Sequence, residues 1–379
     1  MSRYTITNGE VQTFPARLEV RARGGELLAV AEDDQSNVFH KVIPWRDGLL
    51  SIGGDKARLL HWTGAADALT PRVLYEQAFG GAHDRLRDLE IGDVDGDGQD
   101  ELVLATHDQG MVVVLDEATP GTWVATELGR TADTFVHEIE LGDLDGDSLL
   151  EIYSTPSEPN KSSGASQPGR VERWAWSGSA YERTLIHAFE GTHAKEILVA
   201  DLGEGPVLLA LQEGRTGAAN LLMDPVAIVR LAPTPTGPWT SEPIGVLLGE
   251  RQARFLVSGD IDGDGLVELV ATGMTTGVWA LDRASLAQPF IATQIDGTSG
   301  GFEQAAHLAD LDGDGALELY VASEPDHGKP RQLRRYKWGK EQFERSVLST
   351  FEGSGLIWGL SHAELVSQAP AADPVQGSK

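Results

Sequence analysis

Short runs of alternating apolar and polar residues recur along the chain, and the clearest of them flank acidic, glycine-containing segments. One example is LEIGDVDGDGQDELVLAT from Leu89, where alternation precedes and follows the acidic segment. Alternation with a period of two indicates strands with one buried face, and Asp-Gly pairs between such runs indicate tight turns. The pattern therefore predicts pairs of antiparallel strands joined by acidic loops.

This strand–loop–strand pattern occurs four times in full and once in a reduced form, LVADLGEGPVLLALQ from Leu198. The full segments begin at Leu89, Ile139, Leu256 and His307. The leading aspartates of the five loops, which are 50, 58, 59 and 50 residues apart, are Asp93, Asp143, Asp201, Asp260 and Asp310. A repeat of this length is typical of propellers and solenoids.

Each repeat also contains two further strand-like runs, such as GMVVVLD and TWVATEL, which gives it the four strands of one propeller blade. The segment from Val38 has the pattern of another blade, with its loop reduced to Trp45, Arg46, Asp47 and Gly48. Residues 1–33 contain about three strand-like runs without a clear first strand. The segment SGLIWGLSHAEL, from Ser354, resembles a lone first strand.

These ends predict how the fold closes. We expect an all-β, seven-bladed β-propeller of four-stranded blades, closed by pairing of the N- and C-terminal strands, with six or eight blades as alternatives. It would form a single domain over residues 1–367. The small, polar residues 368–379 would form a disordered tail.

The acidic composition restricts the partners. With 58 acidic and 30 basic residues, the formal net charge is -28, which repels nucleic acid and anionic membrane surfaces. No apolar run approaches the ~18 residues of a membrane span. No signal segment is visible at the N-terminus, and cysteine is absent. We expect a monomer with no nucleic-acid partner and no membrane insertion.

The four full loops carry carboxylates at alternate positions, a pattern suited to calcium, which takes about six to eight oxygen ligands at ~2.3–2.6 Å. Glycine between the carboxylates permits the turn. Four loops in register favour calcium over plain hairpin turns. The predicted ligands are Asp93, Asp95, Asp97, Glu101 and the Gln99 carbonyl; Asp143, Asp145, Asp147, Glu151 and the Leu149 carbonyl; Asp260, Asp262, Asp264, Glu268 and the Leu266 carbonyl; and Asp310, Asp312, Asp314, Glu318 and the Ala316 carbonyl.

These loops are not EF-hands. An EF-hand has a glutamate at its twelfth position, where the four loops here have Leu104, Ser154, Ala271 and Val321. In the second loop Ser148 replaces a glycine, and in the reduced loop Gly203 and Gly205 replace carboxylates. We expect about four structural calcium ions, with a strained or weaker second site and no metal at the reduced loop.

The D-x-D-G-D-G-x-x-E loops and their flanking strands resemble the FG-GAP/VCBS repeat family of integrin-type calcium-binding propellers, some lectins and some polysaccharide lyases. The resemblance covers about residues 37 to 367. It implies that the strand before each acidic loop is the innermost strand of its blade, and it suggests an extracellular or periplasmic location. The motif is specific to the repeat and not to one function.

Under this resemblance, polar residues at one register would line the propeller axis. Six residues before each leading aspartate span ~20 Å of strand, which places them near the face opposite the loops. This register holds Arg87, His137, Lys195, Arg254 and Gln304, and a looser alignment adds Phe39 and Trp358. Glycine-bearing loops would bring His83 and His193 to the same mouth.

Such a ring predicts a site for a carbohydrate or another small anionic or polyhydroxylated ligand, with Trp358 or Phe39 as a stacking surface. The alternative explanation is a solvated channel that merely tolerates polar residues. The favoured function is a lectin-like binding module, with a protein surface as a further candidate partner. The alternative function is a lyase, isomerase or cyclase with His137 as the catalytic acid or base. Common hydrolase, P-loop and zinc-protease motifs are absent.

Overall fold

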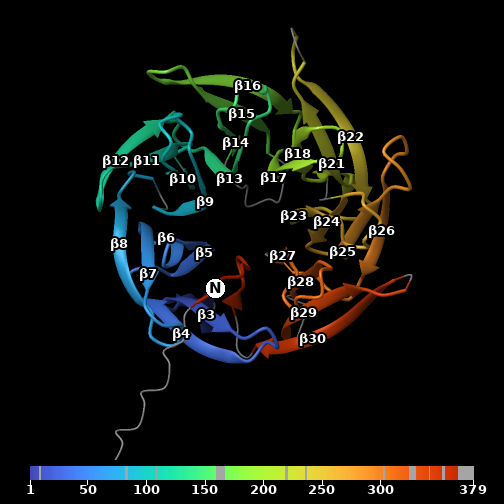
Figure 1. Ribbon diagram of the computed structural model, residues 1–379, viewed down its shortest axis with the longest axis horizontal. Coiled ribbons are helices and arrows are strands. Elements are labelled where there is room, and N and C mark those ends of the chain that lie inside the picture. Colours follow the sequence, from blue (N-terminus) through green and yellow to red (C-terminus); the bar gives the residue numbers. More distant parts are fainter. Residues whose placement is uncertain are drawn as a thin grey trace, which may run out of the picture.

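The computed structural model is a ring of β-sheets around a central axis (Figure 1). All the regular secondary structure of the described residues is β-strand. No helix in the described part is long and apolar enough to cross a membrane. The predicted tail, residues 368–379, and His83 lie outside the described residues. The structure describes residues 1–7, 10–81, 84–107, 109–158, 167–217, 221–234, 237–301, 304–323, 330–340, 342–351 and 355–365.

Six blades follow one another along the chain, each an antiparallel four-stranded sheet whose strand order in space is the order in sequence. Blade 1 contains β5 (Val38–Trp45), β6 (Gly48–Gly54), β7 (Ala57–Thr63) and β8 (Thr70–Gln77). Blade 2 contains β9 (Leu86–Gly92), β10 (Glu101–Thr106), β11 (Val112–Thr119) and β12 (Thr122–Leu128). Blade 3 contains β13 (Phe135–Gly142), β14 (Glu151–Ser157), β15 (Gly169–Trp176) and β16 (Tyr181–Phe189).

The second half of the ring repeats this plan with one insertion. Blade 4 contains β17 (Ala194–Asp201), β18 (Pro206–Gln212), β21 (Val226–Ala232) and β22 (Thr240–Leu247). A small hairpin of β19 (Arg215–Thr216) and β20 (Leu222–Asp224) is inserted in it. Blade 5 contains β23 (Ala253–Gly259), β24 (Glu268–Gly273), β25 (Gly277–Asp282) and β26 (Ile291–Asp296). Blade 6 contains β27 (Ala306–Ala309), β28 (Glu318–Ser323), β29 (Arg331–Trp338) and β30 (Phe343–Phe351).

Blade 7 is built from both ends of the chain. The first residues of β1 (Ser2–Thr7) pair with β31 (Gly355–Leu356), and its last residues pair with β2 (Glu10–Thr13). Backbone hydrogen bonds between Met1 and Arg17 join β1 to the hairpin of β3 (Ala16–Arg21) and β4 (Leu27–Asp33). The prediction of a seven-bladed propeller closed by its terminal strands is confirmed.

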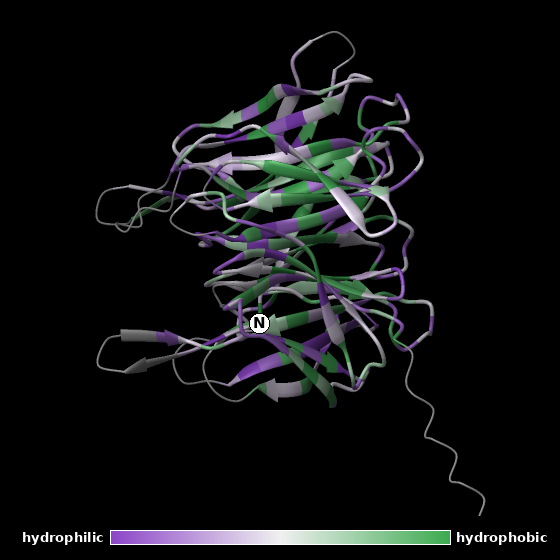
Figure 2. Cartoon of the chain, turned by 90° about the vertical axis from the view of Figure 1, so that its left-hand side faces the viewer, coloured by the Kyte–Doolittle hydropathy of each residue, from purple (hydrophilic) through white to green (hydrophobic). Residues whose placement is uncertain are grey.

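The hydrophobic core is divided among seven clusters of described residues, each of which lies between two consecutive blades. The second strand of a blade is the most deeply buried, and every residue of β10 and β24 is buried. Figure 2 shows these apolar strands inside the molecule, with hydrophilic residues toward its rims. Blade-to-blade packing therefore holds the ring together and fixes the position of the innermost strands.

The innermost strands carry a β-bulge at a recurring place. In blades 1, 2, 4 and 5 the ladder to the second strand skips one residue, which is His40, Arg87, Lys195 or Arg254. In blade 3 the ladder passes from Val136 directly to Ile139 on one side, and from Pro156 to Ser154 on the other. A bulge interrupts the alternation of side chains and re-aims the extra residue. In blades 2, 4 and 5 the bulged residue is the one in the polar register described above.

Candidate functional sites

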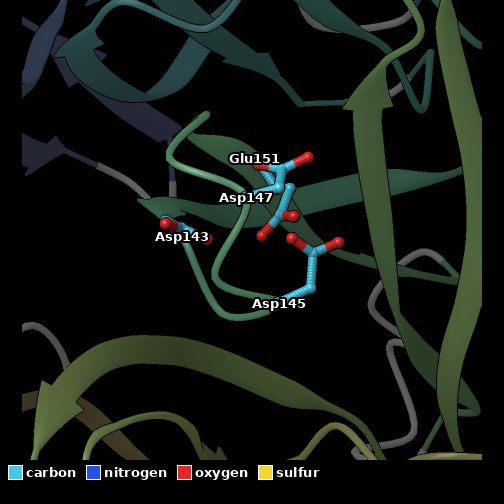
Figure 3. Close-up of side chains that lie close together, drawn as sticks. All are labelled: Asp143, Asp145, Asp147 and Glu151. Atoms are coloured by element: carbon cyan, nitrogen blue, oxygen red, sulfur yellow. The ribbon is translucent and has the colours of Figure 1, made fainter. Parts of the chain in front are cut away.

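In blades 2, 3, 5 and 6, the loop between the first and second strands gathers carboxylates into a cluster that could hold a metal ion. Within each cluster the carboxylate oxygens lie within 4.8 Å of one another. We call these loops 1 to 4, and Figure 3 shows the residues of loop 2. The clusters are Asp93, Asp95 and Glu101; Asp143, Asp145, Asp147 and Glu151; Asp260, Asp262 and Glu268; and Asp310, Asp312 and Glu318.

The leading aspartate shapes each turn. In loop 1, the amides of Gly96 and Gly98 donate to the Asp93 carboxylate at 2.7 and 2.9 Å, and the other loops repeat both bonds. The donating residues have positive φ, which favours glycine. Ser148 has a φ of 73°, so the prediction that it must adopt the glycine conformation is confirmed. An L-residue in this region pays about 1–2 kcal/mol.

The third aspartate has a different role in three of the loops. Asp97, Asp264 and Asp314 lie outside the clusters and accept a hydrogen bond from the backbone amide two residues later. Asp147 makes the same bond and also belongs to its cluster. Loops 1, 3 and 4 thus bring together three of their four predicted carboxylates. The carbonyl ligands of Gln99, Leu149, Leu266 and Ala316 stay predictions.

The glutamate of each motif is buried at the start of the second strand. Glu101 and Glu268 accept the amide hydrogens of Val94 and Ile261 at 2.9 and 2.7 Å. Burial, together with repulsion from the neighbouring aspartates, raises the pKa of Glu101 and Glu268 to about 7. Glu268 Oε1 has no hydrogen-bond partner among the described residues. A cation at the cluster would favour the ionised form, so this set of donors fits a hard metal ion.

The reduced loop in blade 4 keeps the turn without the cluster. Asp201 Oδ1 accepts hydrogen bonds from the amides of Gly203 and Gly205 at 2.7 and 3.0 Å. Both glycines have positive φ, as in the full loops. The turn therefore forms without the additional carboxylates, so turn formation alone does not explain their presence in the other four loops.

The polar register converges near the propeller axis, because the first strands of the blades lie nearest the centre of the ring (Figure 1). The rings of His137 and His193 have centroids 5.4 Å apart. Lys195, Arg254 and Arg87 are all close enough to lower the pKa of His137. The Arg87 guanidinium lies 5.5 Å from the ring centroid of Trp358. We call the set the basic layer: His40, Arg87, His137, His193, Lys195, Arg254, Gln304 and Trp358.

Blade 1 contributes His40 to this layer rather than Phe39. His40 Nδ1 lies 2.6 Å from the Leu86 carbonyl oxygen, and its ring packs edge-on against Trp358 at 4.8 Å. Phe39 instead packs against Trp62, in the core between blades 7 and 1. The assignment of Phe39 to the axial register and to a stacking surface is therefore wrong, because the bulge turns His40 toward the axis.

The basic layer is buried. Apart from Arg87 and Trp358, its members are between 1% and 9% exposed. The Lys195 ammonium lies 3.2 Å from the carboxylate of Glu213, which is 5% exposed. The side-chain atoms of this layer without a hydrogen-bond partner within the described ranges include His40 Nε2, His137 Nδ1 and Gln304 Oε1. An unsatisfied buried polar atom costs about 1–3 kcal/mol, so these atoms need a partner from a bound ligand or from water.

His137 is positioned as a hydrogen-bond acceptor. Its Nε2 lies 3.0 Å from Ser157 Oγ, whose hydroxyl donates to the Glu158 carbonyl at 3.1 Å. In the tautomer with a proton on Nε2, His137 donates to Ser157 Oγ, and Nδ1 keeps a free lone pair. Burial, followed by the nearby His193 and Lys195, lowers the pKa of His137 well below its ordinary value. The imidazole is thus neutral at pH 7 and adds no positive charge.

An acidic layer, which the sequence pattern was not expected to form, adjoins the basic layer. In blades 1 to 4 the residue after the bulged position is Lys41, Asp88, Glu138 or Glu196, and Glu90 and Glu140 follow two positions after Asp88 and Glu138. The Lys41 ammonium donates to Asp88 at 2.7 Å and to Glu90, and it lies 4.0 Å from Glu138. A basic residue followed directly by an acidic one, as in Arg87-Asp88, was the available signal.

Burial dominates the charges of the acidic layer. Burial, together with repulsion between the carboxylates, raises the pKa of Glu138, Glu140 and Glu196 well above the ordinary range. Burial also opposes ionisation of Asp88, but the Lys41 ammonium keeps the pKa of Asp88 below its usual value. The acidic layer therefore combines the ionised pair of Lys41 and Asp88 with glutamates whose protonated form is favoured by burial.

Comparisons with known proteins identify the repeats and the fold. Residues 93–154 and 260–321 match the FG-GAP-like repeat family, whereas no curated protein is significantly similar in sequence. A solved structure of a protein from Lactobacillus plantarum aligns with a TM-score of 0.55 at 12% identity, covering 89% of this chain and 96% of that chain. AofleA from Arthrobotrys oligospora aligns with a TM-score of 0.43 at 11% identity, covering 96% of this chain and 98% of that chain.

Proposed function

Because the chain carries FG-GAP-like repeats on a seven-bladed propeller, we propose that it is a calcium-stabilised binding module. The ligand would be a carbohydrate or another small anionic or polyhydroxylated molecule, held at the basic layer. The observation that carries the ligand site is the convergence of buried polar side chains from five blades, with acceptor atoms left unpaired. Its test is a ligand screen with calcium present.

Calcium suits the four loops because their donors are carboxylate oxygens. The ligands in loop 1 would be Asp93, Asp95 and Glu101, with Asp97 and the Gln99 carbonyl completing the shell. The ion would connect the end of the first strand of a blade to the start of the second. Its role would be structural, since it offsets repulsion between carboxylates that lie within 4.8 Å of one another.

Asp262→Ala is expected to remove one calcium ion per protein molecule, because Asp262 belongs to the loop 3 cluster. Elemental analysis after gel filtration in calcium-containing buffer measures the loss. Glu204→Ala is the matched control, because Glu204 is an exposed acidic residue of the reduced loop. Equal losses of calcium in both variants would show that the ligand register is wrong.

The basic layer offers the features that a small anionic or hydroxylated ligand needs. The guanidinium groups of Arg87 and Arg254 supply charge-assisted donors. Neutral His137 supplies an acceptor for a ligand hydroxyl, and the Trp358 ring supplies an apolar face beside them. The burial of His137 and Arg254 favours a small molecule over a polymer.

Arg254→Ala is expected to weaken binding of an anionic ligand about tenfold or more, because it removes a charge-assisted hydrogen bond of about 1.5–3 kcal/mol. The ligand comes from a thermal-shift screen of uronic acids, neutral sugars, dicarboxylates and inorganic phosphate, and calorimetry gives its affinity. Arg215→Ala is the control, since Arg215 is half-exposed and pairs with Asp224 in the inserted hairpin. A ligand that binds both variants equally would exclude Arg254 from the site.

An enzyme using the same layer is the second candidate, and one observation favours it. His137 Nδ1 is a buried, unpaired acceptor on a neutral imidazole, the form that a general base needs. Product analysis of the compounds that bind in the screen separates this candidate from a binding module.

A further inference from the structure

The four loops differ in the residues that the third strand places beside them. Asp116 follows Leu115, the partner of Leu102, and Asp282 follows Leu281, the partner of Leu269. Loops 1 and 3 therefore have an additional carboxylate beside their buried glutamate. No ion pair among the described residues involves a carboxylate of these two loops.

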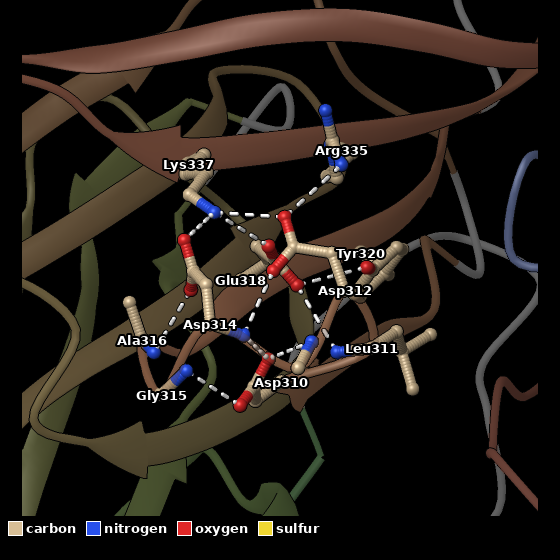
Figure 4. Close-up of polar contacts among 11 residues, drawn as sticks. Asp310, Leu311, Asp312, Asp314, Gly315, Ala316, Glu318, Tyr320, Arg335 and Lys337 are labelled. Atoms are coloured by element: carbon tan, nitrogen blue, oxygen red, sulfur yellow. Dashed lines mark hydrogen bonds and ion pairs between the residues drawn. The ribbon is translucent and has the colours of Figure 1, made fainter.

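Loop 4 has a cation instead. Lys337 is the cross-strand partner of Glu318, and its ammonium donates to Asp312 at 2.8 Å, to Asp314 at 2.6 Å and to Glu318 at 3.2 Å (Figure 4). Arg335, two residues earlier on the same strand, lies 3.8 Å from Asp312. The ammonium thus binds two of the three clustered carboxylates.

Loop 2 also has a cation, which comes from a neighbouring register. The Arg173 guanidinium contacts both Asp145 and Glu151, and Arg173 is the cross-strand partner of Tyr153. Arg335 has the same relation to Tyr320 in loop 4. Both tyrosines donate a hydrogen bond to the buried glutamate of their loop, at 2.6 and 3.0 Å. In loops 1 and 3 these positions hold Val103 and Val270.

The two kinds of loop alternate along the chain. Loop 1 is followed after 50 residues by loop 2, and loop 3 is followed after 50 residues by loop 4. The matched segments 93–154 and 260–321 each contain one loop of each kind. The repeating unit is therefore a pair of blades, formed by blades 2 and 3 and again by blades 5 and 6.

We propose that loops 1 and 3 are the high-affinity calcium sites, whereas Arg173 and Lys337 act as built-in competitors that make loops 2 and 4 low-affinity sites. This inference rests on the proposal that the loops bind calcium. A calcium ion entering loop 4 must displace three charge-assisted hydrogen bonds from Lys337. An ion entering loop 1 displaces no cation and meets the further negative charge of Asp116.

A calcium titration of the chelator-treated protein, followed by native mass spectrometry and calorimetry, tests this difference. We expect two ions to bind at least tenfold more tightly than the other two. Lys337→Met keeps most of the side-chain stem and removes the ammonium, so one weak site should gain at least tenfold in affinity. Lys56→Met is the control, because it removes a charge of the same sign from a half-exposed lysine in blade 1.

Asparagine substitutions show which loops hold the tightly bound ions and which hold the weakly bound ions. Asp260→Asn should abolish one of the tight ions, and Asp310→Asn should abolish one of the weak ions. Four equal sites, or an affinity that Lys337→Met leaves unchanged or lowers, would overturn the inference while calcium binding itself stands. Absence of calcium from every loop would instead overturn the proposed function.

Discussion

Chelation with EDTA is expected to lower the melting temperature of the propeller by roughly 7 °C. An ion that binds only the folded protein adds RT ln(1 + [L]/Kd), about 2.7 kcal/mol at a hundredfold excess of calcium over Kd. Two tightly bound ions therefore add about 5 kcal/mol. The unfolding entropy of about 2.1 cal/mol/K per residue, taken over 379 residues, converts this free energy to the stated shift.

Differential scanning calorimetry with and without EDTA measures the shift, and excess calcium should restore the melting temperature. The double variant Asp93→Asn, Asp260→Asn serves as the control. It removes the leading aspartates of loops 1 and 3, so most of the EDTA-dependent shift should be lost. An identical melting curve in EDTA, with no metal found by elemental analysis, would contradict a structural role for calcium.

The acidic loops and the strands beside them were predictable from the sequence because both are local features. Asp93 and Glu101 lie eight positions apart in one turn, and the same spacing recurs at Asp143, Asp260 and Asp310. Alternation then indicates which strand precedes and which follows each turn. The closure of the ring was also predictable, because each end of the chain holds only part of a blade.

The axial site was only partly predictable, because a bulge does not appear in a count of residues. Counting six residues back from each leading aspartate identified Arg87, Lys195 and Arg254. Blade 1 has no acidic loop from which to count. The looser alignment there selected Phe39, one residue away from the bulged His40.

Contacts between blades were not predictable, because their partners are distant in sequence. Lys41 lies among Asp88 and Glu138 of the next two blades, and nothing in a single repeat indicates this meeting. Arg173 and Lys337 come from third strands, whose register relative to the acidic loop depends on the turn between the second and third strands. The number of carboxylates in each loop therefore predicted four equivalent calcium sites.

The largest single-residue effect on stability is expected from Glu213→Gln. Glu213 lies 3.2 Å from the Lys195 ammonium, and both side chains are nearly inaccessible to solvent. Removing one member of a buried ion pair takes away the opposite charge beside the other member, with a typical loss of about 3–5 kcal/mol. Urea unfolding in saturating calcium measures the loss without interference from the metal loops.

An exposed ion pair in the same blade provides the comparison. Asp224→Asn breaks the ion pair with Arg215, in which both side chains are more than half exposed. This variant should lower the free energy of unfolding by less than about 1 kcal/mol. The double variant Lys195→Met, Glu213→Met separates charge from packing. Since it removes both charges of the pair, it should be clearly more stable than Glu213→Gln alone. If Glu213→Gln and Asp224→Asn lowered the free energy of unfolding by the same small amount, Glu213 would not be the group that compensates the charge of Lys195 in the basic layer.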